Sequence, residues 1–140
     1  MLKFSVLLSV YKSESPDYLR LAINSIYKNQ SVKPNEIVLV KDGILNKDLE
    51  HCIANLISNI PVLKVFGYSI NKGLGYALNF GLKKCSNEIV FRMDTDDIAD
   101  STRFEKQLKV FEKNKNNIAI VGSNIEEFNN CLLYTSPSPR

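Results

Sequence analysis

Short apolar runs alternate with amphipathic helical segments along this chain, and this alternation constrains the fold more than any other feature. The first run, residues 4–10 (FSVLLSV), is almost continuously apolar, as expected for a central strand that is covered on both faces. Further strands are expected at residues 36–41, 62–66, 88–93 and 118–121. The alternation predicts an α/β fold with a mostly parallel sheet and helices on both faces.

The segments between these strands carry helix signals. Ser15 and Pro16 are a capping hydroxyl followed by proline at the first helical position. Asn46 is expected to cap the second helix, and Asp100 or Ser101 a later one. The predicted inward faces are Leu19, Ala22, Ile23, Ile26 and Tyr27 in the first helix, Leu49, Cys52, Ile53, Leu56 and Ile57 in the second, Leu74, Ala77, Leu78 and Leu82 in the third, and Phe104, Leu108 and Phe111 in the fourth.

Charge and cysteine content narrow the class of protein. Lys and Arg number 18 against 15 Asp and Glu, a formal net charge of +3 spread along 140 residues, which is too mild to indicate nucleic-acid binding. No apolar run approaches the roughly 20 residues that span a bilayer, and the apolar start lacks a signal-peptide cleavage site. Cys52, Cys85 and Cys131 have no CxxC spacing, so free thiols in the cytoplasm are expected, and a zinc site is not.

The last ten residues, 131–140 (CLLYTSPSPR), follow neither helical nor strand periodicity. They resemble the conceptual translation of a sequencing-library transposon adapter, and the alternative is a native Ser/Pro linker. We therefore expect residues 1–130 to form the natural part of the domain and residues 131–140 to be an adapter-derived tail.

Polar residues follow the predicted strands at the points where the strands end. Tyr11 follows the first strand, Asp42 the second, Asn71 and Gly73 the third, and an acidic stretch the fourth. Ligands of parallel sheets bind beyond the carboxyl ends of the strands, so this edge is the candidate site.

The acidic stretch, residues 94–97 (DTDD), carries three carboxylates in four positions. Alternation along an extended chain puts Asp94 and Asp96 on one side, within reach of one hard divalent cation. Mg²⁺ takes one or two carboxylates together with substrate phosphate oxygens, so a metal–diphosphate site fits, with Asp97 as a third acid. The alternative is a solvated acidic loop that caps the next helix.

Two further interpretations of this stretch differ in strength. An EF-hand loop beginning at Asp94 fails, because Ala99 stands where that loop needs glycine. A phosphatase would use Asp94 as nucleophile and Asp96 as acid/base. Such enzymes usually carry DxDx[TV] after the first strand. In this chain Ile98 stands in place of the Thr or Val, and the motif comes after the fourth strand. The phosphatase therefore stays an alternative.

The glycines after the third strand form no complete nucleotide-binding motif. Gly73 and Gly75 give GxG, but Leu78 stands where GxGxxG needs its third glycine. The segment is either a simple helix-entry turn or a helix N-terminus whose N–H groups face a phosphate.

Four ordered motifs together resemble the N-terminal half of a family 2 glycosyltransferase of the Rossmann-like GT-A fold, over roughly residues 3–128. The matching segments are SVLLSVY at residues 5–11, EIVLVKDG at 36–43, NKG at 71–73 with Ala77, Asn79 and Gly81, and DTDD at 94–97 followed by Arg103 and Gln107. The chain is most similar to bacterial enzymes of capsule, exopolysaccharide and O-antigen assembly. Ser9 and Lys41 stand where the family commonly has Pro and Asp.

The resemblance implies a C-terminally truncated domain that binds the donor of an inverting, metal-dependent sugar transfer. The donor would be a nucleotide sugar, usually a UDP-sugar, and the acceptor a saccharide or a lipid-linked saccharide, with possible peripheral association of the intact enzyme at the inner membrane face. In the implied site, Tyr11 lies against the base, Asp42 accepts a hydrogen bond from the edge of the base, Asn71 and Gly73 belong to the donor site, and Asp94, Asp96 and Asp97 line the site of Mg²⁺ or Mn²⁺ and the diphosphate. The family's general base comes in a later acidic motif, so it is expected beyond residue 130, and a non-catalytic fragment is a further alternative.

Overall fold

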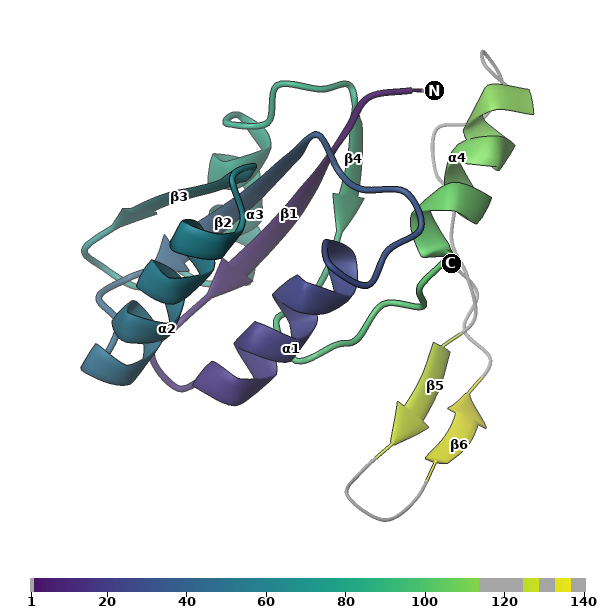
Figure 1. Cartoon of the computed structure of the whole chain (residues 1–140). Coiled ribbons are helices and arrows are strands. Elements are labelled where there is room, and N and C mark those ends of the chain that lie inside the picture. The colour runs from purple at the N-terminus through teal and green to yellow at the C-terminus, as the bar shows by residue number, and fades with distance from the viewer. Residues whose placement is uncertain (1, 114–124, 129–132, 137–140) are drawn as a thin grey trace.

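A parallel four-stranded sheet forms the centre of the fold. The computed structural model describes residues 2–113, 125–128 and 133–136. Its elements are β1 (Phe4–Val10), α1 (Pro16–Ile26), β2 (Glu36–Asp42), α2 (Lys47–Asn59), β3 (Leu63–Tyr68), α3 (Leu74–Leu82), β4 (Ile89–Arg92), α4 (Arg103–Lys113), β5 (Ile125–Phe128) and β6 (Leu133–Ser136) (Figure 1). The sheet has the order β3-β2-β1-β4 with every pair parallel, and β5 pairs with β6 antiparallel. The strand predicted at 118–121 lies outside the described residues.

Helices cover both faces of this sheet, as the sequence predicts. α1 and α2 pack on one face, where Phe104 and Leu108 of α4 join the same core, and α3 covers the other face (Figure 1). Alternation along β1 divides the side chains between the two cores: Phe4, Val6, Leu8 and Val10 face the α1/α2 side, and Leu7 packs with Val38, Val40 and Ala77 on the α3 side. The α/β class is therefore confirmed. Among the described helices, none combines the length and the apolar character needed to cross a membrane.

The helices begin where their capping residues predict. The Ser15 hydroxyl accepts a hydrogen bond from the Tyr18 N–H at 3.4 Å, and the Asn46 side-chain oxygen accepts one from the Leu49 N–H at 2.9 Å. Before α4, the Asp100 carboxylate accepts hydrogen bonds from the N–H and hydroxyl of one residue, Thr102. These side chains satisfy N–H groups that a helix start leaves without a partner.

The predicted inward faces of α2 and α3 are wrong at three leucine and isoleucine positions. Leu74 and Leu82 are 50% and 52% exposed, and Ile57 is 47% exposed. α3 meets the sheet through the buried small residues Ala77 and Gly81, with Leu78 partly buried beside them. Leu74 and Leu82 are the first and last residues of the helix and reach solvent. Ile57 lies at the outer margin of α2, beside the edge strand β3.

Gly81 sets the distance between α3 and the sheet. A methyl group on Gly81 would lie 2.4 Å from Leu7 Cδ1 and 2.7 Å from Val40 Cγ2. We expect Gly81→Ala to lower the free energy of unfolding by about 1–3 kcal/mol through overpacking, measured by urea denaturation. Gly75→Ala in the same helix is the matched control, because the added methyl group meets no atom within 4 Å apart from its chain neighbours and the backbone of its own helix. That variant should be neutral or more stable, by up to about 1 kcal/mol; equal losses in the two variants would contradict this account.

A buried carboxylate, Glu36 at the start of β2, joins several segments at the opposite end of the sheet from the candidate site. Glu36 is 3% exposed and accepts hydrogen bonds from Ser5 Oγ at 2.7 Å, Lys64 Nζ at 2.8 Å, and both the N–H and hydroxyl of Ser86 at 2.8 and 3.0 Å. Burial opposes ionisation of Glu36, but these hydrogen bonds outweigh it and hold the pKa at about 2. The network links β1, β2, β3 and the turn after α3.

Candidate functional site

The carboxyl edge of the sheet brings the sequence-predicted residues into two groups. Asp42, Asn71 and Gly73 form one group between the ends of β2 and β3, and they are linked by hydrogen bonds. The acidic residues after β4 form the second group. Tyr11 lies directly after β1, the strand between them in the sheet, with its side chain 43% exposed.

Asp42 holds the loop between β3 and α3 in place. It is 4% exposed; its Oδ1 accepts hydrogen bonds from Tyr68 Oη and the Lys72 N–H, both at 2.8 Å, and its Oδ2 accepts one from the Gly73 N–H at 3.1 Å. The Asn71 side-chain amide donates to the Asp42 carbonyl at 3.2 Å. A carboxylate offers about four acceptor positions, so one position on Oδ2 remains for a ligand.

Two glycines shape the same loop region. Gly43 and Gly73 have φ of +89° and +92°, a left-handed conformation that favours glycine. A methyl group on Gly43 would lie 2.8 Å from the Asn71 nitrogen, so any side chain there would displace the loop that Asp42 binds. Gly73 is the N-cap residue of α3 and has no side chain to cap it.

The Tyr68 hydroxyl offers a direct test of this arrangement. Tyr68→Phe removes one donor to Asp42, and we expect it to lower the free energy of unfolding by about 1 kcal/mol, measured by urea denaturation. Tyr76→Phe is the control, since that exposed hydroxyl only accepts a 3.4 Å hydrogen bond from Lys72 Nζ. Equal stability of the two variants would show that the Tyr68–Asp42 hydrogen bond contributes nothing.

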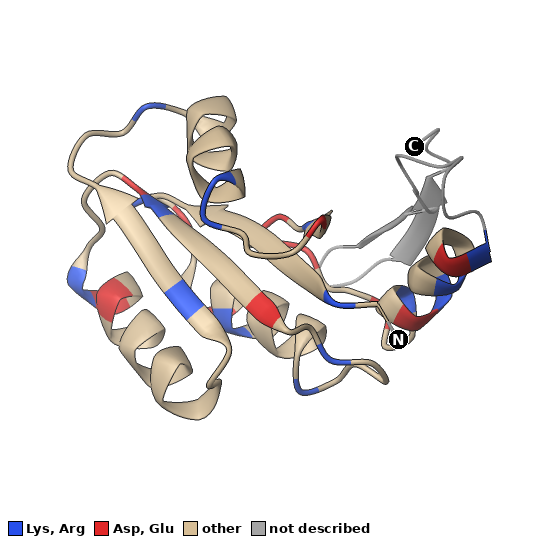
Figure 2. Cartoon of the chain, turned by 90° about the horizontal axis from the view of Figure 1, so that it is seen from above, with Lys and Arg blue, Asp and Glu red and all other residues tan. Residues whose placement is uncertain are grey.

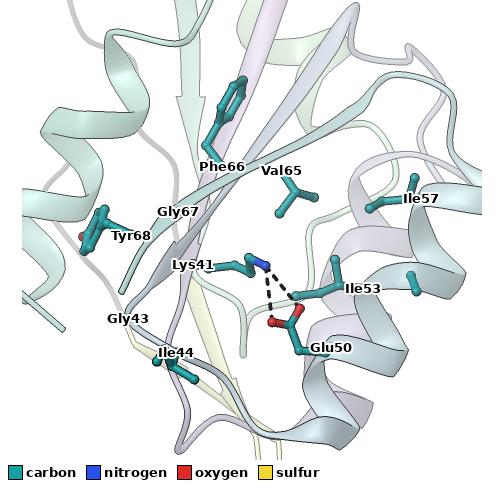
Figure 3. A pocket seen from close by; sticks show the side chains of 11 residues that line it. Lys41, Gly43, Ile44, Glu50, Ile53, Ile57, Val65, Phe66, Gly67 and Tyr68 are labelled. Carbon is teal, nitrogen blue, oxygen red and sulfur yellow. Dashed lines mark hydrogen bonds and ion pairs between the residues drawn. The ribbon is translucent and has the colours of Figure 1, made fainter. Parts of the chain in front are cut away.

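Lys41, where the family commonly has Asp, points away from Asp42. Alternation in β2 turns its side chain toward α2, where Nζ lies 3.2 and 3.3 Å from the two carboxylate oxygens of Glu50 (Figure 3). The ion pair lies in an open groove of about 540 Å³ between α2 and the edge strand β3, which Ile57 and Val65 also line (Figure 3). The partners of the Asp42 carboxylate are therefore Tyr68, Lys72 and Gly73, and the Lys41 ammonium pairs with Glu50 instead.

A second hollow, of about 410 Å³, opens directly at the candidate site. Its lining residues come from the loops after β1, β2 and β3: Lys12, Asp42, Gly43, Ile44, Leu45, Asn46, Ser69 and Asn71. Asn46 closes one side of it by donating a hydrogen bond to the Lys12 carbonyl at 3.0 Å. This hollow places a buried acceptor and an exposed amide beside a space of ligand size.

The acidic stretch gathers its three carboxylates at one point. Asp94, Asp96 and Asp97 are exposed, and one carboxylate oxygen from each lies within 4.8 Å of the other two. Oxygen donors at this spacing suit a hard cation such as Mg²⁺ or Mn²⁺, whose opposite ligands stand about 4.2 Å apart, so the residues fit a divalent ion. Asp94 also accepts a hydrogen bond from Arg92 Nη2 at 3.0 Å. Basic and acidic positions are otherwise interspersed, and α4 carries both signs (Figure 2).

Glu14, in the loop after β1, joins this acidic group and was missed from sequence. Its carboxylate accepts a hydrogen bond from the Thr95 hydroxyl. Burial, followed by the charges of Asp96 and Asp94, raises the pKa of Glu14 to about 7. In the sequence, the one indication that Glu14 belongs to the site is its position four residues after a strand that ends at the same edge of the sheet.

Arg103 and Gln107 match the residues that come after DTDD in the family pattern. They stabilise the start of α4 and do not line the 410 Å³ hollow. Arg103 donates from Nη2 to the Arg92 carbonyl at 3.0 Å and from Nε to Gln107 Oε1 at 3.1 Å. Its guanidinium lies over the rings of Phe91 and Phe104, at 5.6 and 5.4 Å from their centroids. These contacts fix both ends of the segment that carries the acidic stretch.

Comparison with known proteins identifies the family. Residues 5–134 match the family described as Glycosyl transferase family 2. The chain belongs to this family. It is 45% identical over 127 residues to an uncharacterized glycosyltransferase of Haemophilus influenzae, covering 91% of this chain and 46% of that protein. It is 41% identical over 126 residues to the UDP-Gal:alpha-D-GlcNAc-diphosphoundecaprenol beta-1,3-galactosyltransferase of Escherichia coli, covering 90% and 45%.

This family 2 chain spans about half the length of those curated relatives. Among solved structures it resembles S. aureus TarS 1-349 in complex with UDP-GlcNAc, with a TM-score of 0.68 and 26% identity over 87% of this chain and 38% of that one. The GT-A fold and the glycosyltransferase resemblance are confirmed, and the family assignment favours the transferase over the phosphatase alternative. The family match extends to residue 134, and the origin of residues 131–140 stays a prediction.

Proposed function

We propose that this chain binds the nucleotide-sugar donor of an inverting, metal-dependent glycosyltransferase of bacterial surface polysaccharide synthesis. One observation carries the proposal: the sheet edge that holds the exposed carboxylates of Asp94, Asp96 and Asp97 also holds the buried acceptor Asp42 beside a ligand-sized hollow. The names of the relatives support a UDP-sugar donor and a lipid-linked acceptor, because they specify UDP-Gal, a diphosphoundecaprenol acceptor and bound UDP-GlcNAc. Such an acceptor would bring the intact enzyme to the inner face of the membrane.

The nucleoside end of the donor fits the Asp42 side of the site. Uracil presents one N–H donor on its pairing edge, and Asp42 Oδ2 keeps one acceptor position for it. The exposed ring of Tyr11 offers an apolar face against which a base can stack. Asn71 and Gly73 hold the loop that closes the hollow on the β3 side.

The diphosphate end fits the acidic stretch. Asp94, Asp96 and Asp97 would hold Mg²⁺ or Mn²⁺ through their carboxylate oxygens. When bound, the cation offsets the charge that develops on the departing nucleoside diphosphate. This chain brings the three carboxylates together on one segment, and the hydrogen bond from Arg103 to the Arg92 carbonyl at the end of β4 stabilises that segment. The acceptor hydroxyl would attack in line with the departing group, which inverts the sugar, and its general base would lie beyond residue 130.

Calorimetric titration of UDP into the 140-residue chain tests this proposal, once a cooperative thermal melt shows that the chain is folded. We expect saturable UDP binding in the presence of MnCl₂ and much weaker, residual binding in EDTA, because the carboxylates repel a bare diphosphate. GDP serves as the control for the base, and weaker binding of GDP would support a uracil pocket. Absence of UDP binding with Mn²⁺, or identical binding in EDTA, would contradict the proposal.

A further inference from the structure

Thr95 lies in the middle of the acidic stretch but differs from its neighbours in burial. It is 3% exposed, whereas the side chains of Asp94, Asp96 and Asp97 are exposed. Its hydroxyl donates a hydrogen bond to Glu14, 81 positions earlier in the chain. We propose that the Thr95–Glu14 pair positions the carboxylates of the acidic stretch for cation binding, an inference that rests on the proposed function.

The segment between β4 and α4 contains neither helix nor strand, so it depends on individual contacts for its shape. At its start, the Met93 N–H donates to the Leu7 carbonyl at 3.1 Å and extends the pairing of β4 with β1. Near its end, the Ala99 N–H donates to Ser25 Oγ of α1 at 3.0 Å. The three carboxylates lie between these two anchors, and the contact of Thr95 with Glu14 ties the stretch to the loop after β1.

The acidic stretch is a turn, which brings Thr95 close to all three acids. A hydrogen bond from the Asp97 N–H to the Asp94 carbonyl at 3.2 Å closes this turn, so the stretch is not the extended segment that the sequence predicts. Inside the turn Glu14 holds the Thr95 hydroxyl, while the neighbouring carboxylates stay exposed.

Glu14 reaches the acidic stretch from a separate segment of the chain. It is half-buried in the loop after β1, and its contact with Thr95 joins that loop to the turn that carries the three carboxylates. Groups that orient metal ligands in this way commonly change metal affinity by 10–100-fold when they are removed.

The experiment measures Mn²⁺ affinity of the UDP-saturated 140-residue chain, from the electron paramagnetic resonance signal of free Mn²⁺. We expect Thr95→Val to weaken Mn²⁺ binding by about 10-fold, with Thr95→Ser restoring it to within about twofold. Thr102→Val is the matched control: its hydroxyl lies in the same segment but donates to Asp100 instead of Glu14, so its affinity should equal that of the wild type. Glu14→Ala should weaken binding at least as much as Thr95→Val.

The outcomes separate this inference from the proposed function. Wild-type affinity in Thr95→Val, with Asp96→Ala defective, would overturn the positioning role and leave the cation site intact. Failure of the wild type to bind Mn²⁺ in the presence of UDP would remove the cation site and with it the positioning role. If a thermal melt shows Thr95→Val unfolded, Glu14→Ala decides: unchanged Mn²⁺ affinity in that variant overturns the inference, and a loss of about 10-fold supports it.

Discussion

Glu36→Gln is expected to lower the free energy of unfolding at pH 7 by about 3 kcal/mol, although Glu36 lies at the opposite end of the sheet from the candidate site. The magnitude follows from the pKa of Glu36, which falls from an ordinary 4.5 to about 2 in the folded protein. Burial alone would raise that pKa, so the hydrogen bonds from Lys64, Ser86 and Ser5 must stabilise the ionised form strongly. Glutamine keeps the size of the protonated acid but not the charge that these donors stabilise.

The pH dependence of unfolding gives this prediction a second signature. Between pH 4.5 and about 2 the unfolded chain binds a proton at Glu36 that the folded chain does not, so the stabilisation is complete above pH 4.5 and is lost as the pH falls toward 2. Urea denaturation of the wild type and of Glu36→Gln should therefore differ at pH 7 and converge near pH 2. Glu88→Gln, the same change at an exposed residue, should unfold within about 0.5 kcal/mol of the wild type. A constant difference at every pH would contradict this assignment.

The parts of the fold that follow from local signals could be predicted from sequence. The apolar run at 4–10 and the caps Ser15 and Asn46 act within a few residues, and the structure confirms the strand and both helix starts. The inward faces of α2 and α3 could not be predicted in full, because helical spacing does not give the distance between a helix and a sheet. Gly81 sets that distance for α3, and its close contact is with Leu7, 74 positions earlier.

The candidate site divides in the same way. Residues such as Asp42 and Asp94 follow strands, so the rule that ligands bind at strand ends selects them without knowledge of the packing. Glu14 and Glu36 are defined instead by hydrogen bonds to residues far along the chain, Thr95 in one case and Ser86 in the other. Sequence periodicity does not indicate such long-range pairs. In the sequence alone, each glutamate is indistinguishable from an ordinary acidic residue on the surface.

Asp96→Asn is expected to weaken UDP binding in the presence of Mn²⁺ by roughly 100-fold, since stabilisation by a bound cation amounts to several kcal/mol. Asparagine keeps the shape of the side chain and removes one of the three charges that lie within 4.8 Å of one another. Calorimetric titration of UDP measures the effect, and Asp48→Asn, at an exposed acid of α2, is the matched control. The control variant should bind UDP like the wild type. Wild-type affinity in Asp96→Asn would exclude Asp96 as a ligand of the cation.

Repeating the Asp96→Asn titration in EDTA separates loss of a metal ligand from loss of structure. Without a cation, the carboxylates of Asp94, Asp96 and Asp97 repel the diphosphate, so removing one charge should leave residual UDP binding equal or slightly stronger. A variant whose loop is distorted would instead bind UDP more weakly under both conditions. The substitution should therefore weaken UDP binding only when Mn²⁺ is present, because the same carboxylate attracts the cation and repels the ligand that the cation holds.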